Sequence, residues 1–243
     1  MHTNAATDRR TVPTAQAAWL EHLRGADAYN RWIFETIRPF VAGRTLEVGC
    51  GTGTFSRLLA GAAAHLTAVD IEAPFVAATE RATADCTNAT VICADATLYP
   101  WPQSFDTIVA LEVIEHIADD AGFLRTLGAA LAPGGRLVLK VPALPALYGA
   151  LDRAVGHHRR YDRRGLGERL TEAGLAVVTI VYFNAVGALG WWLNGRVLGR
   201  TGPPGAQVRA FDAAVPLLRR LERLVSPPIG LSLFAVATRP VPQ

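Results

Sequence analysis

Glycines and one acid gather in a single short segment of the chain. The segment LEVGCGTG, residues 46–53, holds glycines at positions 49, 51 and 53 and a carboxylate at Glu47. Glycine allows a tight backbone turn and lets a ligand lie against the chain without a Cβ in the way. The Glu47 carboxylate would repel a pyrophosphate and attract a cation. The segment therefore predicts a binding loop for a positively charged small molecule.

Two familiar glycine patterns do not fit this segment. The dinucleotide pattern GxGxxG fails because its last position would be Thr54 or Ser56 in the two available registers. The P-loop pattern fails because no Gly-Lys-Ser/Thr follows the glycines. A nicotinamide-dependent oxidoreductase is therefore an unfavoured alternative.

Three further acids stand where short apolar runs end. These are Asp70, Asp95 and Glu112. An acid at the end of a second strand can accept both hydroxyls of a ribose, and a later one can accept an exocyclic amine. Each could alone be a turn residue at a strand end. Together they favour a site for a nucleoside-like ligand.

An ExxEH pattern follows the fourth apolar run. It consists of Glu112, Glu115 and His116. An imidazole titrates near neutral pH, so His116 could act as a general base on a hydroxyl acceptor. The alternative is that His116 only hydrogen-bonds its own loop.

The segment GHHRRYD, residues 156–162, combines two imidazoles, two guanidiniums and a phenol. His157 is a second candidate base. Arginine forks suit a carboxylate or a phosphate on an acceptor substrate. The residues predicted to bind the acceptor here are Arg159, Arg160 and Tyr161. The alternative is a solvated loop whose arginines pair with nearby acids, namely Asp152, Asp162 or Glu168.

Short apolar strands alternate with helical segments through the first part of the chain. The predicted strands are Thr45–Val48, Leu66–Asp70, Thr90–Ala94, Asp106–Leu111 and Arg136–Val141. Helices are predicted over 14–38, which includes Trp19 and Leu20, and over 54–62, 74–84 and 118–131. Near-continuous apolar strands in such an alternation imply a parallel sheet covered on both faces. The predicted fold class is a doubly wound α/β fold.

The pattern changes after residue 142. A helix is predicted over 163–173, a strand over 175–183, two helices over 185–199 and 207–224, and a last strand over 231–237. We therefore predict an N-terminal helical lid (1–40), a core (41–183 and 230–243) and a helical insertion or cap (184–229) between the last two strands. The adjacent Trp191 and Trp192 could pack in the core, form a dimer or cap, or touch a lipid surface.

With these motifs in order, the sequence resembles the class I S-adenosylmethionine-dependent methyltransferases over about residues 44–182 and the final strand. LEVGCGTG resembles their first motif, VD at 69–70 the second, and ADA at 94–96 the third. FDTIVALEVIEHI and LAPGGRLVL resemble the fourth and fifth, and GHHRRY is similar to a segment of bacterial small-molecule methyltransferases. The resemblance implies a Rossmann-like, mostly parallel, seven-stranded sheet.

The resemblance also implies roles for single residues. Glu47 and the glycines would line the methionine end of S-adenosylmethionine, Asp70 would hold the ribose hydroxyls, and Asp95 would take the adenine amine. The full set of predicted cofactor-binding residues is Glu47, Gly49, Cys50, Gly51, Gly53, Asp70, Ile71, Asp95, Ala96, Leu111 and Glu112. His116 and His157 are the predicted catalytic residues, and Tyr29 joins the acceptor-binding group. A similar ExxEH in quinone O-methyltransferases is associated with a divalent metal; here no metal is predicted.

The predicted function is methyl transfer from S-adenosylmethionine to a small-molecule acceptor through an O, N or C nucleophile. A lipid- or glycan-linked acceptor at a membrane surface is an alternative, and a non-catalytic binding module is a weaker one. Methyl transfer to nucleic acid is disfavoured, because a net charge of +3 makes no basic surface run and no Asn/Asp-Pro-Pro-aromatic motif follows the fourth strand.

The composition indicates the cellular compartment that suits the protein. Three cysteines without a CxxC pair and a polar start favour a reduced, cytoplasmic chain. The stretch Ala173–Gly195 carries no charge, yet its β-branched first half and the interruption at Asn184 favour a buried strand leading into a helix over a membrane span. A homodimer is compatible with the sequence.

Overall fold

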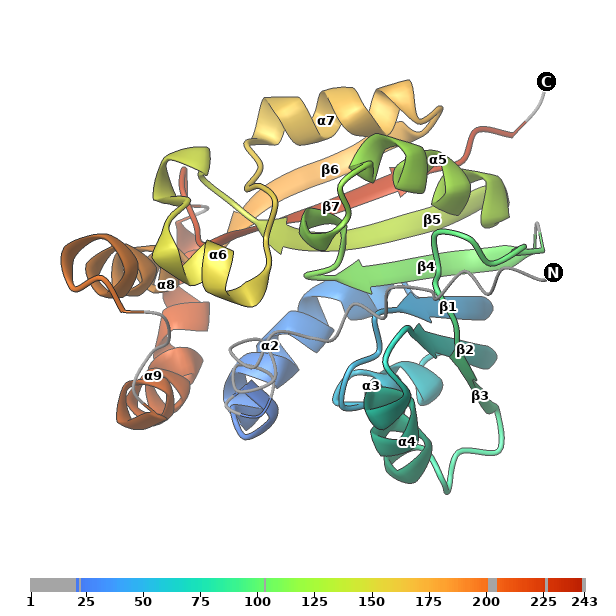
Figure 1. Ribbon diagram of the computed structural model, residues 1–243, viewed down its shortest axis with the longest axis horizontal. Helices are drawn as coiled ribbons and strands as arrows, with labels where there is room; N and C mark the ends of the chain where they lie inside the picture. Colours follow the sequence, from blue (N-terminus) through green and yellow to red (C-terminus); the bar gives the residue numbers. More distant parts are fainter. Residues whose placement is uncertain (1–20, 22, 103, 201–204, 226, 242–243) are drawn as a thin grey trace, which may run out of the picture.

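A seven-stranded sheet with the order β3-β2-β1-β4-β5-β7-β6 forms the centre of the protein (Figure 1). The computed structural model describes residues 21, 23–102, 104–200, 205–225 and 227–241. The predicted helical positions Trp19 and Leu20, with the rest of residues 1–20 of the predicted lid, lie outside the described residues. Residues 201–204 and 226 of the predicted insertion also lie outside them.

The strands follow the predicted alternation closely. They are β1 (Arg44–Val48), β2 (His65–Asp70), β3 (Ala89–Cys93), β4 (Phe105–Leu111), β5 (Leu131–Pro142), β6 (Ala176–Phe183) and β7 (Ser232–Thr238). The first five strands pair in parallel, and β7 runs antiparallel to both β5 and β6. The predicted Rossmann-like, mostly parallel, seven-stranded sheet is confirmed.

Helices flank the sheet and cover the edge where its parallel strands end. The α-helices are α2 (Asp27–Ile37), α3 (Ser56–Ala60), α4 (Ala73–Ala82), α5 (Asp120–Ala130), α6 (Ala150–Val155), α7 (Arg163–Glu172), α8 (Ala185–Trp192) and α9 (Gly205–Leu224). Short 3₁₀ turns are η1 (Arg38–Phe40), η2 (Ile114–His116) and η3 (Pro145–Leu147), and η4 (Leu193–Val197) is a π-helical turn. No helix among the described residues is long and apolar enough to cross a membrane.

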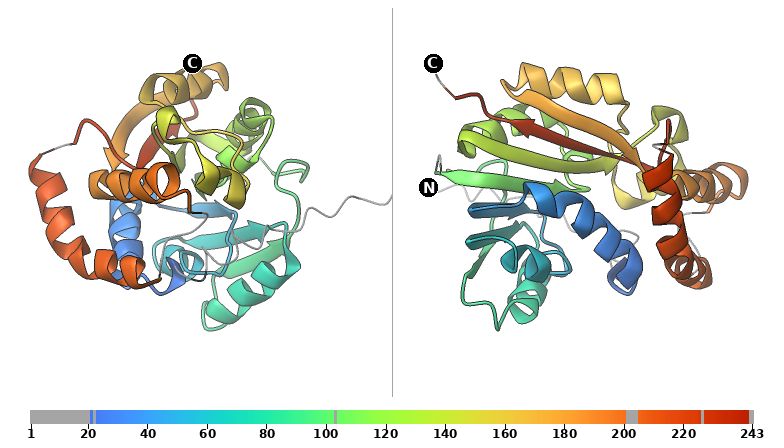
Figure 2. Two further views of the ribbon diagram at one scale, coloured as in Figure 1. Left: turned by 60° about the vertical axis from the view of Figure 1, so that its left-hand side comes forward. Right: turned by 180° about the vertical axis from the view of Figure 1, so that it is seen from behind.

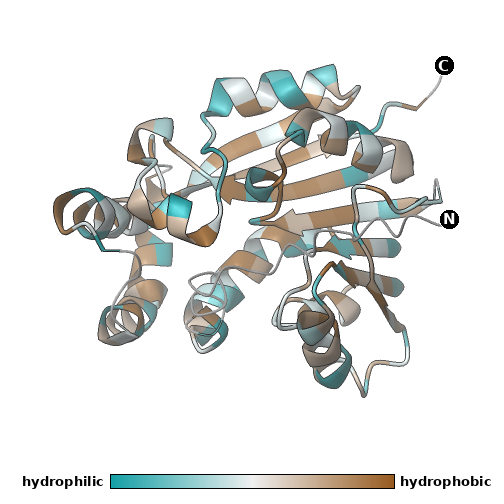
Figure 3. Ribbon diagram, viewed as in Figure 1, coloured by the Kyte–Doolittle hydropathy of each residue, from teal (hydrophilic) through white to brown (hydrophobic). Residues whose placement is uncertain are grey.

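Alternating side chains of the strands build one core on each face of the sheet. Ile108 of β4 and Leu137 of β5 pack with residues of α5 and α7. Val109 and Val138, their neighbours in the chain, pack with residues of α2, α3 and α9 on the other face. This is the period of two that a strand buried on both sides requires. Figure 3 shows the resulting brown, hydrophobic run along β4 and β5.

Several predicted boundaries differ from the structure. The helix predicted over 14–38 is interrupted at residues 25 and 26, before α2 begins at Asp27. Strand β5 begins at Leu131, before the predicted Arg136, because the PGG sequence at 133–135 continues the strand through a shift in register against β4. The helix predicted over 185–199 is α8 followed by the π-turn η4. In that turn the buried Asn194 side chain donates to the Gly190 carbonyl (2.8 Å) and to Gln207 (3.0 Å).

Two acids of α9 accept hydrogen bonds from helix starts, and one of them, Asp212, fastens the insertion to the N-terminal helix. Asp212 of α9 accepts from the backbone N–H of Tyr29 (2.8 Å), in the first turn of α2. Glu222 accepts from the N–H of Ala185 (2.7 Å), at the start of α8. An ion pair between Arg219 and Glu35 adds to the contact of α9 with α2. Figures 1 and 2 show α8 and α9 at the end of the molecule to which the arrowheads of β4 and β5 point.

Candidate active site

A cavity of about 660 Å³ lies beyond the carboxyl ends of β1, β4 and β5. Open parallel sheets bind ligands at this edge, beside the point where the strand order reverses. Loops after β1 and β4 form one wall, and α2, α8 and α9 form the other. The lining is mostly apolar. The charged or titratable exceptions include Glu47, Glu112, Lys140, His116, His157 and Arg160.

The glycine loop after β1 is shaped for close approach. Gly49, Gly51 and Gly53 all have positive φ angles, of 72°, 54° and 79°. A Cβ added at Gly49 would lie 2.7 Å from Cγ2 of Val113, and one at Gly53 would lie 2.9 Å from Cα of Thr79. Larger residues would therefore have to displace the loop, which supports the glycine requirement predicted from the sequence.

Glu47 presents an unsatisfied carboxylate at this loop. Its side chain is buried in the cavity wall, and Oε2 has no hydrogen-bond partner among the described residues. Burial raises the pKa of Glu47 to about 8. A buried, unpaired carboxyl group is costly unless a ligand supplies a donor or a positive charge. The Glu47 carboxyl group therefore fits the ammonium end of S-adenosylmethionine.

Asp70 holds the loop from the neighbouring strand. Its Oδ2 accepts from the N–H of Gly51 (2.9 Å), and its Oδ1 accepts from the N–H of Glu72 (3.0 Å). Asp95, after β3, accepts from the N–H (2.8 Å) and hydroxyl (2.6 Å) of Thr97. The two acids follow adjacent parallel strands along one edge of the sheet. A role in holding ribose and adenine stays a prediction for both.

The structure divides the predicted cofactor residues into two groups. The residues on the cavity wall are Glu47, Gly49, Cys50, Gly51, Leu111 and Glu112. Those that continue along the sheet edge, outside the cavity lining, are Gly53, Asp70, Ile71, Asp95 and Ala96. Ile71 exposes half of its surface (52%) there, as an adenine-packing residue would in the free protein. The thiol of Cys50 is buried, and burial raises its pKa to about 12, so it stays neutral.

A partly buried ion pair lies at the end of β4. Glu112 has a positive φ of 56°, and its Oε1 pairs with Nζ of Lys140 and accepts from Oγ of Ser232 (3.2 Å). Burial alone would raise the pKa of Glu112, but the Lys140 ammonium outweighs it and lowers that pKa to about 2. The pKa of Lys140 is raised in turn, because the Glu112 charge overcomes the effect of burial. Glu112 is therefore ionised at neutral pH.

His157 is held by a buried carboxylate. Its Nδ1 lies 3.0 Å from Oδ1 of Asp152, which also accepts from Nε of Arg160 (2.7 Å). The other oxygen of Asp152 accepts from the N–H of Gly149 (2.9 Å). Burial would raise the pKa of Asp152, but His157 and Arg160 outweigh it and lower it. An ionised Asp152 favours the tautomer with a proton on Nδ1, which leaves Nε2 of His157 able to accept a proton.

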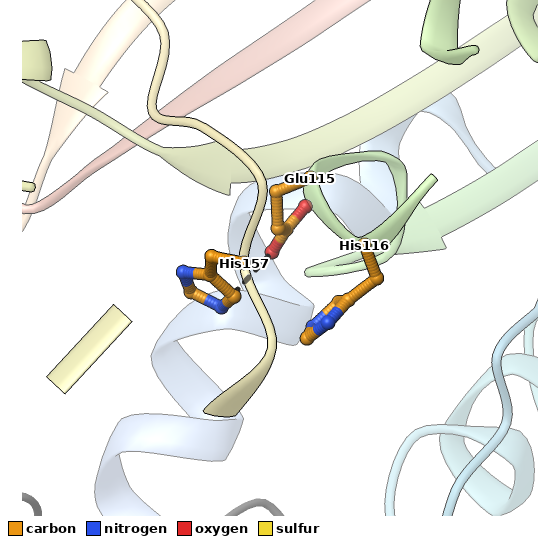
Figure 4. A group of neighbouring side chains, drawn as sticks. All are labelled: Glu115, His116 and His157. Atoms are coloured by element: carbon orange, nitrogen blue, oxygen red, sulfur yellow. Dashed lines mark ion pairs between the residues drawn. The ribbon is translucent and has the colours of Figure 1, made fainter. Parts of the chain in front are cut away.

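His116 lies beside His157, from a different loop (Figure 4). The two imidazole rings are 4.8 Å apart in an edge-to-face arrangement, and both line the cavity. Burial, and then the neighbouring His157, lowers the pKa of His116 to about 4. His116 is therefore neutral at physiological pH.

Glu115 is the third member of this group. It is fully buried, and its Oε1 lies 3.9 Å from Nε2 of His157. Burial and the nearby Glu112 charge raise its pKa well above the usual range. Glu115, His116 and His157 each offer a ligand atom, and these atoms lie within 4.8 Å of one another. Such a set could hold a divalent cation, and the absence of a metal therefore stays a prediction.

The four predicted acceptor-binding residues are placed differently. Tyr29 and Arg160 line the cavity, and the Arg160 guanidinium lies 4.7 Å from the ring centre of Trp191. Arg159 and Tyr161 are not on the cavity wall. Instead, the Arg159 guanidinium lies 2.6 Å from the Asp120 carboxylate, and the Tyr161 hydroxyl donates to that carboxylate (2.7 Å). These two residues fasten their loop to α5.

Sequence reasoning missed three residues that hold this site together: Asp152, Lys140 and Ser232. Asp152 entered the sequence analysis only as a partner for a solvated arginine. Lys140 carried a signal, because it is a charged residue inside the apolar run LVLKVP at 137–142. Ser232 carried none, because its contact with Glu112 joins residues 120 positions apart.

Comparisons with known proteins agree with this geometry. Residues 19–180 match a family model described as a methyltransferase domain. The ubiquinone biosynthesis O-methyltransferase of Pseudomonas paraeruginosa is 32% identical over 167 residues, which cover 62% of this chain and 71% of that protein.

Solved structures share the fold. An S-adenosylmethionine-dependent methyltransferase from Mesorhizobium loti superposes with a TM-score of 0.63 at 21% identity, covering 88% of this chain and 100% of that one. The N-methyltransferase NodS from Bradyrhizobium japonicum, in complex with S-adenosyl-L-homocysteine, gives a TM-score of 0.57 at 18% identity, covering 97% of this chain and 94% of NodS. With the family match covering most of its length, this chain belongs to the methyltransferase-domain family and is an S-adenosylmethionine-dependent methyltransferase.

Proposed function

We propose that this enzyme methylates a hydroxyl oxygen of a small, largely apolar acceptor, with His157 as the group that takes the hydroxyl proton. The observation that carries the proposal is the Asp152–His157 pair at the wall of a mostly apolar cavity. The relative from Pseudomonas paraeruginosa, named an O-methyltransferase of ubiquinone biosynthesis, supports oxygen as the nucleophile.

Residues of the β1 loop would hold the methyl donor. Glu47 lines the cavity and has a carboxylate oxygen without a hydrogen-bond partner among the described residues, and the loop glycines allow the ligand to lie against the backbone. Asp70 and Asp95 would extend the site along the sheet edge. When bound, S-adenosylmethionine supplies a methyl group on a positively charged sulfur, which leaves as a neutral thioether.

Apolar and aromatic side chains would bind the acceptor. Tyr29 of α2 packs edge-to-face against Phe211 of α9, with ring centres 5.5 Å apart, and both line the cavity. Leu151 and Val155 of α6 line the side next to His157. Such a lining excludes water and holds the acceptor in one orientation, which is the main contribution a protein makes to methyl transfer.

His157 would move the proton. A neutral hydroxyl is a poor nucleophile, and transfer of its proton to Nε2 of His157 raises electron density on the oxygen as the new C–O bond forms. The ionised Asp152 stabilises the resulting imidazolium, as an acid does in the histidine pairs of hydrolases. His116, neutral at physiological pH, would act as a hydrogen-bonding neighbour of the acceptor oxygen.

A panel of phenols, aliphatic alcohols and amines tests this proposal. The purified enzyme is incubated with S-adenosylmethionine, and methylated products are identified by mass spectrometry. We expect O-methyl products, and a fall in turnover of about 10²–10⁴ for His157→Ala. The matched control is His158→Ala, because His158 is exposed and adjacent. Methylation of amines alone, with His157→Ala fully active, would contradict the proposal.

A further inference from the structure

Helix α8 and the turn η4 expose a stripe of large apolar side chains. Val186, Leu189, Leu193 and Val197 follow one another at helical spacing, and 40–64% of the surface of each is exposed. Residues three and four apart lie on one side of a helix. The stripe therefore forms an apolar strip along α8 and η4, and part of it faces the cavity.

Helix α9 carries a second exposed stripe. Its buried side presents Val215 to the core. Leu217, Leu221 and Leu224, on the other side, expose 62%, 51% and 82% of their surface. A helix that packs on a protein normally turns polar residues outward. We name the exposed apolar residues of α8, η4 and α9 the insertion patch: Val186, Leu189, Trp192, Leu193, Val197, Leu217, Leu221 and Leu224.

Positive charge accompanies this patch. Residues 184–229 contain six arginines and two acids, so their net charge of +4 exceeds the +3 of the whole chain. Both acids, Asp212 and Glu222, are used by helix starts. Arg220 and Arg223 are exposed and form no ion pair with any residue that the structure describes. Helical spacing places Arg220 between Leu217 and Leu224 on the outer side of α9.

The insertion patch is continuous with the cavity. Val186, Leu189 and Leu193 belong to the patch and also line the cavity. The exposed apolar surface of α8 and η4 therefore extends into the cavity. Figure 2 shows these two helices together at one end of the molecule.

We propose that the insertion patch docks on the surface of an anionic lipid bilayer. Exposed apolar side chains interleaved with arginines match a bilayer interface, where apolar groups enter the acyl boundary and arginines meet lipid phosphates. A second copy of this chain fits less well, because a twofold interface would bring two segments of charge +4 against each other. Docking is independent of the proposed O-methylation; where both hold, an apolar acceptor enters the cavity from the bilayer.

Vesicle co-sedimentation of the purified full chain, without cofactor or acceptor, tests this. Vesicles of phosphatidylcholine alone are compared with vesicles that contain about one third phosphatidylglycerol. We expect binding to the anionic vesicles, weakened by high salt. The double variant Arg220→Glu/Arg223→Glu and the double variant Leu189→Ser/Leu221→Ser should each lower the partition coefficient at least about tenfold.

Matched controls come from exposed residues far from the insertion. Leu98→Ser, at a side chain that is 81% exposed, and Arg81→Glu, on α4, should bind vesicles like the parent protein. Binding of S-adenosylhomocysteine by all variants verifies their folding. Equal binding of the parent to both kinds of vesicle, no binding at all, or unchanged binding by both patch variants would overturn the proposal. Dimerisation in light scattering that the leucine variants abolish, with no vesicle binding, would assign the patch to a second copy.

Discussion

The cofactor half and the acceptor half of the cavity differ in how the charge of their carboxyl groups is compensated. Glu47, in the cofactor half, has no cation beside it, and burial holds its pKa near 8. Glu112, at the border with the acceptor half, pairs with Lys140, and its pKa is about 2. Glu47 can pair only with a positive charge that a ligand supplies, whereas Glu112 already pairs with Lys140. Of these two acids on the cavity wall, Glu47 is therefore the candidate binding group, whereas the charge of Glu112 is compensated by Lys140.

The two halves also differ in how the chain builds them. In the cofactor half, Glu47, Asp70 and Asp95 each lie within a few residues of the carboxyl end of β1, β2 or β3. In the acceptor half, His157 depends on Asp152, and Glu112 depends on Lys140 and Ser232 from other elements. Substitutions in the acceptor half should therefore affect either chemistry or folding through partners, while those in the cofactor half should affect ligand affinity.

The largest effect is expected from Asp152→Asn. Without an ionised partner, His157 can adopt the wrong tautomer and its imidazolium is no longer stabilised. Turnover should fall by about 10²–10⁴, with little change in the affinity for S-adenosylhomocysteine. Steady-state kinetics and calorimetry measure the two quantities. A change in the acceptor KM alone, with unchanged turnover, would show that Asp152 does not position His157 for proton transfer.

Lys140→Ala tests the structural side of the comparison. It leaves the Glu112 carboxylate, whose side chain is 34% exposed, without its cation, and we expect a loss of about 1–3 kcal/mol in the free energy of unfolding. The double variant Lys140→Met/Glu112→Gln should recover most of this loss, because it removes both charges. Denaturant titration measures both variants. Equal stability of Lys140→Ala and the parent would mean that the Lys140–Glu112 pair does not stabilise the folded protein.

Glu47→Gln should stabilise the ligand-free protein and weaken cofactor binding. The folded-state pKa of about 8 exceeds the ordinary value of 4.5, so the unfolded chain releases this proton first. The free energy of unfolding therefore falls as pH rises from about 4.5 to about 8. At pH 7 it is lower by up to about 3 kcal/mol than below pH 4.5. Removing the titrating group should recover that amount.

Cofactor affinity should show the opposite dependence on pH. A cationic amino group binds the ionised Glu47, so the affinity of the parent for S-adenosylhomocysteine should rise about tenfold per pH unit until about pH 8. Glu47→Gln should remove this slope. A parent affinity that is flat between pH 6 and 8 would place the ammonium elsewhere.

Arg159→Ala distinguishes a support from an acceptor-binding residue. Its guanidinium pairs with the buried Asp120 outside the cavity lining. We expect a loss of about 1–3 kcal/mol in stability and an unchanged acceptor KM. Thermal unfolding and kinetics on the same preparation measure both. An increased KM with unchanged stability would restore the acceptor-binding role predicted from the sequence.

The smallest effect is expected from metal removal. Nε2 of His157 cannot both accept a proton and bind a cation, so dialysis against a chelator should leave turnover within about twofold of the untreated enzyme. Activity that disappears and returns only with an added divalent cation would assign Glu115, His116 and His157 to a metal centre.

The sequence predicted the sheet and the cofactor loop well because both depend on local patterns. Apolar runs such as Phe105–Leu111 and the glycines at 49, 51 and 53 act through their immediate neighbours. The acceptor half depends on tertiary contacts. Nothing local shows that Arg159 meets Asp120 of α5. Asp152 and His157 are only five residues apart, but their contact depends on α6 ending at Val155 and on the turn at Gly156.

The pH dependence of the His157→Ala defect tests the central claim most directly. With a phenolic acceptor, the parent and the variant are compared from pH 7 to pH 10 under saturating S-adenosylmethionine. If His157 removes the hydroxyl proton, the variant should be about 10²–10⁴-fold slower at pH 7 and should approach the parent as the phenol, with an ordinary pKa of about 10, ionises by itself. A defect of the same size at every pH would contradict proton transfer to His157.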